Sequence, residues 1–257
     1  MNSILTINDV KKSFDGIDAL NGASFDVEKG KITGLIGPNG AGKTTLFNTI
    51  TGFISPESGS IKFEGEELIG KPPYEITRKG LARTFQITRS LDKMTVMDNL
   101  LLAPREQTGE SVIWPIITPG KVEEEEIEVR EMAMDILEFF NLDEHKDEYA
   151  GSLSGGQKKL LELARVLMIE PKMVLLDEAF AGVNPSLSNK LVDYIKHLRD
   201  DHEISFLLIE HDIPLIMEVC EDIIVMAKGE VIARGKPKEI KNNQKVLDAY
   251  LGVVHDE

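Results

Sequence analysis

The segment GPNGAGKT at residues 37–44 constrains the fold of this 257-residue chain more than any other feature. A near-continuous apolar run, KITGLIG, precedes it and suits a buried strand, and a helix-forming stretch follows it as far as Gly52. The pattern G-x-x-x-x-G-K-[ST] between a strand and a helix is typical of a loop whose backbone N–H groups surround phosphate oxygens. The sequence therefore predicts a nucleotide-binding P-loop rather than a glycine-rich turn without a ligand.

The side chains of this loop predict its chemistry as well as its fold. Lys43 is expected to reach the terminal phosphates and to act in catalysis, and the Thr44 hydroxyl suits Mg²⁺, which prefers oxygen ligands. The loop residues expected to contact ATP are Gly37, Pro38, Asn39, Gly40, Ala41, Gly42, Lys43, Thr44 and Thr45. A GTPase would also carry Asn-Lys-x-Asp; the nearest segment, NKLVD at 189–193, has its Asp one position late, which excludes that class.

Polar residues end two further apolar segments. MVLLDEA places Asp177 and Glu178 after an apolar strand, and FLLIEHD places His211 after another. Ligands of parallel sheets lie at the carboxyl ends of the strands. We therefore expect Asp177 to hold Mg²⁺, Glu178 to polarise the attacking water, and His211 to hydrogen-bond the γ-phosphate and that water.

The order of elements predicts the fold class. Alternating segments before residue 70 predict short antiparallel strands, and after residue 170 strands alternate with helices, which indicates a mostly parallel sheet. Between them, apolar residues at Val129, Met132, Ile136 and Phe140 indicate a helix, while residues 103–121 are rich in Pro and Gly and predict a surface loop. We expect an α/β P-loop NTPase core (1–86 and 170–257) with an N-terminal antiparallel β subdomain and an inserted α-helical subdomain (87–169).

Roles can also be predicted for several residues outside these motifs. Gln86 lies at the boundary of the expected helical subdomain, where its amide oxygen would ligate Mg²⁺ in one subdomain orientation. Phe14 lies between early strands and either stacks on adenine or packs in the core. Cys220 is expected to be a small buried apolar residue, and His145, His197, His202 and His255 are expected to be solvated.

Composition limits the classes of partner. The net charge of −15 disfavours nucleic acid, and the single cysteine excludes an internal disulfide. No segment has the roughly 20 apolar residues of a membrane span, and the N-terminus does not read as a signal peptide, so we expect any membrane role to depend on a partner.

Taken together, GPNGAGKTT, Gln86, LSGGQ at 153–157, LLDE and His211 resemble, in order and spacing, the nucleotide-binding subunit of ATP-binding cassette (ABC) transporters. The resemblance covers nearly the whole chain, and LSGGQ is its most specific motif. It implies that two cassettes, identical or paralogous, dimerise head to tail around ATP and Mg²⁺. The ATP held by one P-loop would be capped by Ser154, Gly155, Gly156 and Gln157 of the other subunit. A serine hydroxyl, two glycine N–H groups and a helix N-terminus suit an anion.

The same resemblance implies a peripheral ATPase at the cytoplasmic face of the membrane, acting with integral permease subunits and indirectly with a substrate-binding protein. Ala179 departs from the proline usual in the family, which predicts a less rigid loop after Glu178. The segments ARTFQITRSLDKMTVMDNLLLA and VLDAYLG are similar to cassettes of branched-chain amino acid importers. A lipopolysaccharide-type exporter, a soluble non-transport ABC ATPase, and a nucleotide-binding regulator without turnover are the alternatives.

Overall fold

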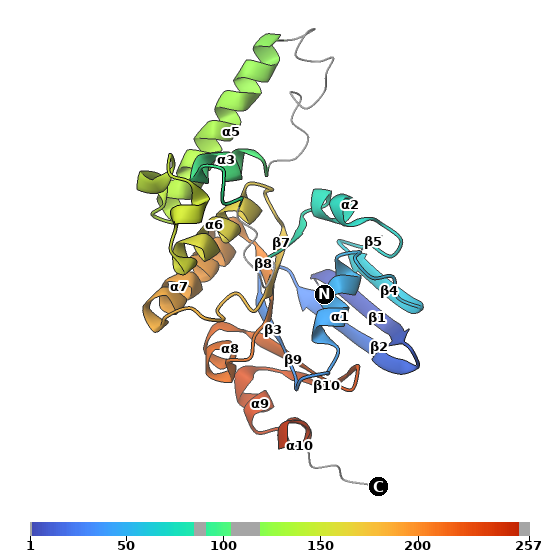
Figure 1. The fold of residues 1–257 in the computed structure, drawn as a ribbon. Coiled ribbons are helices and arrows are strands. Elements are labelled where there is room, and N and C mark those ends of the chain that lie inside the picture. The colour runs from blue at the N-terminus through green and yellow to red at the C-terminus, as the bar shows by residue number, and fades with distance from the viewer. Residues whose placement is uncertain (1, 85–90, 104–118, 252–257) are drawn as a thin grey trace.

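The computed structural model describes residues 2–84, 91–103 and 119–251. Two sheets lie side by side, with helices over the outer face of the larger sheet (Figure 1). The smaller sheet is antiparallel, in the order β2-β1-β4-β5. Its strands are β1 (Ser3–Phe14), β2 (Ile17–Glu28), β4 (Ser58–Phe63) and β5 (Glu66–Glu67). This is the antiparallel N-terminal part predicted from the sequence.

The larger sheet has the order β10-β9-β3-β8-β7-β6, and all its neighbours are parallel except β10 and β9. Its strands are β3 (Ile32–Ile36), β6 (Leu81–Arg83), β7 (Met173–Asp177), β8 (Ser205–Ile209), β9 (Asp222–Ala227) and β10 (Glu230–Gly235). Every residue of β3, β7 and β8 is buried, as expected for central strands covered on both faces. The predicted α/β class with a mostly parallel sheet is confirmed.

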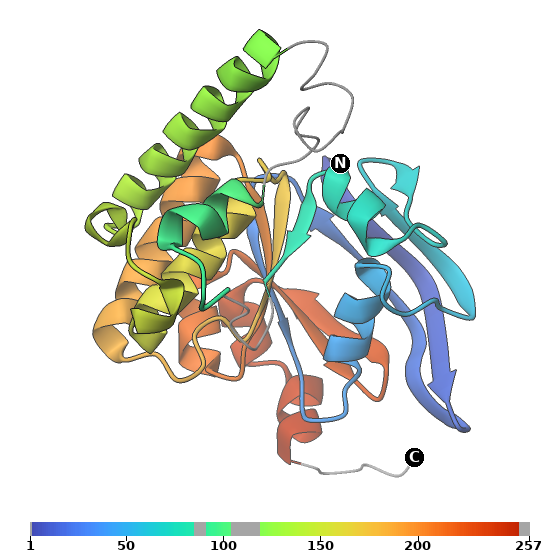
Figure 2. The same cartoon turned by 45° about the horizontal axis from the view of Figure 1, so that its top comes forward.

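Alternate residues of these strands enter two separate cores. Val174, Leu176, Phe206 and Leu208 pack toward the helices, while Leu175, Leu207 and Ile209 pack toward α1 and the antiparallel sheet. Figure 2 shows α1 between the two sheets. The helices are α1 (Lys43–Ile50), α2 (Pro73–Arg78), α3 (Val96–Leu101), α5 (Pro119–Phe139), α6 (Gly155–Leu167), α7 (Pro185–His202), α8 (Ile213–Val219), α9 (Pro237–Lys241) and α10 (Gln244–Leu251).

The helix α5 was predicted, but its buried face differs slightly from the expected one. Ala133, Leu137 and Phe140 are fully buried, whereas Val129, Met132 and Ile136 are only partly buried. The burial thus follows a stripe one position further along the helix, because α5 packs against α3 and α6 at an angle set by their side chains. Cys220 is buried at the end of α8, as expected.

Candidate functional site

The P-loop connects β3 to α1, and its glycines are required by close backbone contacts. A Cβ at Gly37 would lie 2.1 Å from the carbonyl oxygen of Met226, and one at Gly42 would lie 2.4 Å from that of Ala19. Both residues also have positive φ, of 155° and 99°. Gly42 caps α1 without a side-chain hydrogen bond, so the first N–H groups of the helix face the loop. This backbone fits a bound phosphate.

Lys43 lies within the loop and is almost completely buried. Its Nζ donates hydrogen bonds to the carbonyl oxygens of Gly37, at 2.7 Å, and Pro38, at 3.1 Å. Burial lowers the pKa of the Lys43 ammonium, and the negative charges of Glu178 and Asp177 partly oppose this. The ammonium therefore lies in the field of the two carboxylates that the sequence assigned to the same site.

Strand register brings the three predicted strand ends to one edge of the sheet. Leu35 of β3 pairs with Ile209 of β8, which pairs with Asp177 of β7. The P-loop, the residues after β8 and the residues after β7 therefore start at the same level. Thr44 lies in the first turn of α1 at this edge, so the edge supplies a hydroxyl and carboxylates, which is the donor set that Mg²⁺ prefers.

Glu178 and His211 are in direct contact. The Nε2 atom of His211 lies 3.1 Å from Oε1 of Glu178. Glu178 has a left-handed backbone with φ of 51°, and its N–H donates to the carbonyl oxygen of Ile209. A left-handed glutamate is an uncommon conformation that is held here by its neighbours, and such conformations cluster at functional sites. The arrangement places a carboxylate and an imidazole beside the P-loop.

Asp177 is paired with a residue that the sequence did not single out. The Nη2 atom of Arg83 on β6 lies 2.6 Å from Oδ2 of Asp177, and both side chains are buried. Arg83 also donates to Oδ1 of Asn48 at 2.7 Å, and its guanidinium lies over the ring of Phe47. An arginine in a short apolar strand was the available signal, because a buried guanidinium requires a partner.

The loop after Glu178 is bonded to two neighbouring elements. Lys159 of α6 donates to the carbonyl oxygen of Ala179 at 2.8 Å, and the N–H of Phe180 donates to Oε1 of Glu210 at 2.9 Å. Burial raises the pKa of Glu210 to about 7. Glu210 directly precedes His211, so it had the same strand-end signal as Asp177, and the sequence analysis missed it.

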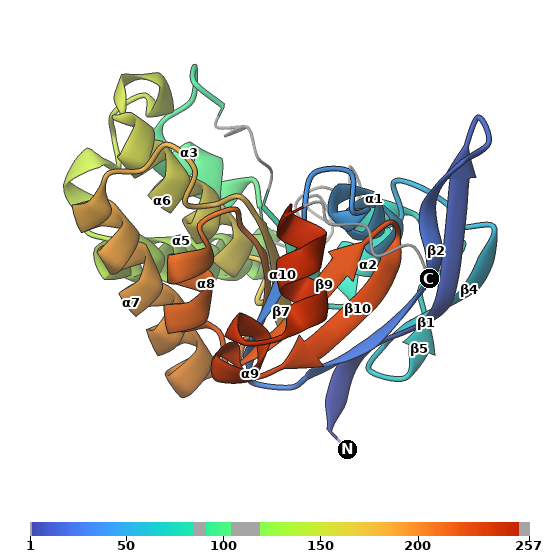
Figure 3. The same cartoon turned by 90° about the horizontal axis from the view of Figure 1, so that it is seen from below.

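The C-terminal helix also reaches the P-loop. Figure 3 shows α10 beside β9 and β10. Burial raises the pKa of the Tyr250 hydroxyl, and the nearby backbone N–H of Gly37 partly opposes this rise. Nothing in the sequence pattern of α10 indicated that contact, since it joins residues more than 200 positions apart.

The motif LSGGQ forms the start of α6. Ser154 is the N-cap and forms a capping box with Gln157, while Gly155 and Gly156 occupy the first helical positions. A Cβ added at Gly155 would have no neighbouring atom within 4 Å, whereas one added at Gly156 would clash with the Leu187 side chain. The first turn of α6 therefore presents a serine and backbone N–H groups as a second anion-binding terminus.

Known proteins share these features. Residues 20–181 match the family model described as ABC transporter. The chain belongs to the ABC transporter family. Residues 230–256 match a second model, described as branched-chain amino acid ATP-binding cassette transporter. As a member of this family the chain is an ATP-binding subunit and an ATPase.

Curated relatives cover nearly the whole ABC cassette. A probable branched-chain amino acid transport ATP-binding protein, LivG, of Archaeoglobus fulgidus is 46% identical over 99% of this chain and 97% of its own length. BraF of Pseudomonas aeruginosa, a high-affinity branched-chain amino acid transport ATP-binding protein, is 40% identical over 97% and 98%.

Solved cassettes share the fold. MJ1267, an ATP-binding cassette of an ABC transporter solved in its ADP conformation, is 37% identical with a TM-score of 0.83, covering 98% of this chain and 100% of its own. MJ0796, a bacterial cassette described as dimeric, has the same fold with a TM-score of 0.74 at 22% identity, covering 91% of this chain and 98% of its own.

Several predictions about single residues have structural outcomes. Phe14 is 44% exposed, so it is not a core residue, and Lys12 lies over its ring. His145, expected to be solvated, is partly exposed at 31%, and its Nε2 lies 2.8 Å from Nε2 of Gln157. The expected magnesium ligand Gln86, and most of the loop expected at 103–121, lie outside the described residues. No helix in the described part of the ABC cassette is both long and apolar enough to cross a membrane.

Proposed function

We propose that this chain hydrolyses ATP as one of two cassettes that power a membrane permease importing branched-chain amino acids. The observation that carries the proposal is the position of the Glu178–His211 pair at the sheet edge that also holds the P-loop. The pair supplies a base beside a phosphate-binding loop, which is what hydrolysis requires. A regulator without turnover would have no use for it.

Each residue then has a stated role. The N–H groups of residues 37–45 and Lys43 bind the phosphates, and Thr44 and Asp177 hold Mg²⁺, which neutralises phosphate charge when bound. Glu178 accepts a proton from the attacking water, and His211 fixes the position of Glu178 through the 3.1 Å contact. Phe14 is an exposed ring available for stacking on adenine. Gln86 is retained as a proposed magnesium ligand from the resemblance.

The second half of the site comes from a partner cassette. Ser154, Gly155, Gly156 and Gln157 form an anion-binding helix terminus on the same chain as the P-loop. A chain with two such termini completes both only if two copies, or a copy and a paralogue, face each other across a two-fold axis. The dimeric description of MJ0796, which has this fold, supports that arrangement.

The permease is proposed to dock in a groove between the helical subdomain, residues 87–169, and the core. The groove has a volume of about 300 Å³ and is lined by residues of α2, β6 and α6, including Ile76, Arg83, Glu162 and Arg165. Phe53 lines it and is 54% exposed. Because Arg83 both lines the groove and holds Asp177, a permease segment bound there would contact the ATP site through one side chain.

The solute and the direction rest on the family comparison. Both curated relatives are named for branched-chain amino acid transport, and residues 230–256 match the corresponding family model. This favours import over a lipopolysaccharide-type exporter or a soluble ABC ATPase. We infer a peripheral position at the cytoplasmic face, with a substrate-binding protein acting through the permease.

Phosphate release by purified protein tests the proposal. The change Glu178→Gln keeps the size of the side chain but removes the base, so we expect hydrolysis to fall at least about 100-fold. ATP binding should persist in a titration, and a dimer should accumulate with MgATP. Wild-type hydrolysis by Glu178→Gln would refute the catalytic role. Reconstituted permease that transports no leucine with ATP would refute the solute assignment.

A further inference from the structure

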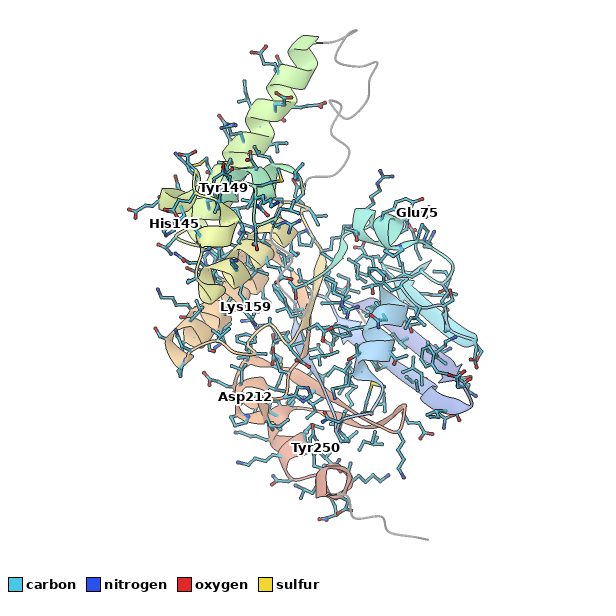
Figure 4. The ribbon with its side chains drawn as sticks, in the orientation of Figure 1. Glu75, His145, Tyr149, Lys159, Asp212 and Tyr250 are labelled. Atoms are coloured by element: carbon cyan, nitrogen blue, oxygen red, sulfur yellow. The ribbon has the colours of Figure 1, made fainter. Side chains whose placement is uncertain are left out.

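His145 is tied to the LSGGQ motif through a chain of hydrogen bonds. It ends the short 3₁₀ helix Asp143–His145, next to the N-terminus of α6 (Figure 4). Its Nε2 lies 2.8 Å from Nε2 of Gln157, and its Nδ1 lies 3.1 Å from Oε1 of Glu148. The imidazole is only 31% exposed. Both ring nitrogens therefore have partners, one of them in the motif itself.

The bonds of Gln157 fix which atoms donate. Its Oε1 accepts from the backbone N–H of Ser154 at 2.9 Å and from the Ser154 hydroxyl at 2.8 Å. The amide nitrogen of Gln157 is therefore the group that faces His145 and donates to it. Nε2 of His145 must accept, so the ring proton lies on Nδ1 and is donated to Glu148; this assignment follows from the network. Glu148 in turn accepts from the Ser152 hydroxyl at 3.3 Å.

We propose that His145 is a positioning residue for Ser154, acting through the amide of Gln157. The inference rests on the proposed function, in which Ser154 caps ATP held by the partner cassette. Without an acceptor at Nε2, the Gln157 amide loses one of the three hydrogen bonds that orient it, so Oε1 is held toward Ser154 less firmly. A rotated amide would present NH₂ to the Ser154 N–H, and the first turn of α6 would lose its capping box. The Ser154 side chain would then adopt other rotamers.

The hydrogen-bond network, rather than the neighbouring charges, assigns Nε2 of His145 as the acceptor. The pKa of the Glu148 carboxyl is lowered mainly by its hydrogen bond with His145. Its Oε2 also accepts a hydrogen bond from the Ser152 hydroxyl. On α6, Lys158 is paired with Asp92, with Nζ 3.2 Å from Oδ1. The other charged residues of the turn are Asp143, Glu144, Lys146 and Asp147. A proton on Nε2 of His145 would face the amide NH₂ group of Gln157, so this hydrogen bond exists only while Nε2 carries no proton.

Two substitutions at one position separate positioning from general stability. His145→Leu removes the acceptor, and His145→Gln restores an oxygen or nitrogen at a similar reach without a titratable ring. His202→Gln on α7 is the matched control, since His202 is exposed and its ring lies beside that of His197 on the same helix, away from the LSGGQ motif. Each is measured for kcat and KM of ATP hydrolysis from about pH 8 to about pH 5.5, the range in which histidine changes charge.

We expect His145→Leu to lower kcat about 5- to 10-fold at pH 8, as for one lost hydrogen bond, with KM within about 2-fold. His145→Gln should recover most of that loss and show a flatter decline in acid than wild type. Thermal melting of all three should match wild type. If His145→Leu does not fold, the inference is still tested by comparing the pH dependence of kcat in His145→Gln with that of wild type.

Two results would overturn the inference. The first is a wild-type kcat in His145→Leu, and the second is an acid decline in His145→Gln that follows wild type. Neither result would contradict the proposed function, because the capping role of Ser154 is tested separately by Ser154→Ala. If Ser154→Ala hydrolyses ATP at the wild-type rate, the capping role itself fails, and the role of His145 fails with it.

Discussion

Arg83 and Asp177 form a buried ion pair across two parallel strands, with Nη2 2.6 Å from Oδ2 and side chains 8% and 6% exposed. The carboxylate expected to hold Mg²⁺ is thus oriented by the protein before any nucleotide binds. Arg83 ends β6, three positions before Gln86 in the sequence. Positioning of this kind lowers the cost of ordering the site.

Breaking this pair should destabilise the protein strongly. Arg83→Met leaves Asp177 buried without its cation, and such a loss typically costs about 3–5 kcal/mol. Urea unfolding at pH 8 measures the free energy of unfolding. The double variant Arg83→Met with Asp177→Asn should recover part of the loss, because it also removes the stranded charge. An Arg83→Met protein as stable as wild type would show that the pair contributes nothing to folding.

Glu210 should make stability depend on pH. Its pKa rises from 4.5 to about 7 in the folded protein because burial disfavours the carboxylate. A raised carboxyl pKa means that the folded state binds the proton more tightly than the unfolded state. Its favourable contribution is therefore complete below about pH 4.5 and is lost as the pH rises to about 7, by roughly 3 kcal/mol in all.

Glu210→Gln tests this directly, since the amide still accepts from the N–H of Phe180. The variant should gain stability over wild type as the pH rises from about 5 to about 8, by roughly 1–3 kcal/mol. Thermal or urea unfolding at several pH values measures the difference. Glu75→Gln on α2, a partly exposed glutamate labelled in Figure 4, is the control and should give no such trend. A constant difference between Glu210→Gln and wild type at all pH values would contradict the assignment.

The sequence predicted the parts of the site that lie within continuous motifs. Residues 37–45, Asp177 and Glu178 follow buried strands, so a local pattern was enough to place them at one sheet edge. Arg83 and Tyr250 were missed because their partners are distant in the chain, and His145 was missed because its contact with Gln157 depends on how the intervening turns fold. The contacts of Arg83 and Tyr250 depend on how β6 pairs with β7 and how α10 packs on β10, which no local period encodes. The rotated face of α5 was missed for the same reason.

Tyr250 should support the P-loop. Tyr250→Phe removes the hydroxyl that lies near the Gly37 N–H but keeps the ring, so the loop loses one polar contact, worth at most about 1 kcal/mol. We expect the KM for ATP to rise about 3- to 5-fold with kcat nearly unchanged. Steady-state kinetics measures both. Tyr149→Phe, an exposed tyrosine on the helical side, is the matched control. An unchanged KM would show that α10 does not influence the loop.

Phe53 should matter only when the permease is present. Phe53→Asp places a charge in the groove, and we expect permease-stimulated hydrolysis in proteoliposomes to drop about 10-fold, because an apolar contact is lost and a carboxylate is desolvated. Hydrolysis by the isolated cassette should stay at the wild-type rate. Ile127→Asp on α5, 53% exposed and outside the groove, is the control. Normal stimulation of Phe53→Asp would place the permease elsewhere.

A substitution at Gly155 can distinguish an effect on the fold of the single cassette from an effect on its dimer. A Cβ there would meet nothing within 4 Å, so a single chain has no steric need for glycine at the first position of α6. Gly155→Ala should melt at the wild-type temperature or slightly above, since alanine favours a helix over glycine by up to about 1 kcal/mol.

The γ-phosphate of a nucleotide bound by the opposite cassette would, however, meet the added methyl group. In the Glu178→Gln background we therefore expect MgATP to produce at least about 10-fold less dimer, measured by light scattering across a concentration series. Glu128→Ala, at an exposed position of α5, controls for a gain in helix propensity alone. If Gly155→Ala dimerises and hydrolyses ATP as wild type does, the start of α6 does not cap a partner's nucleotide.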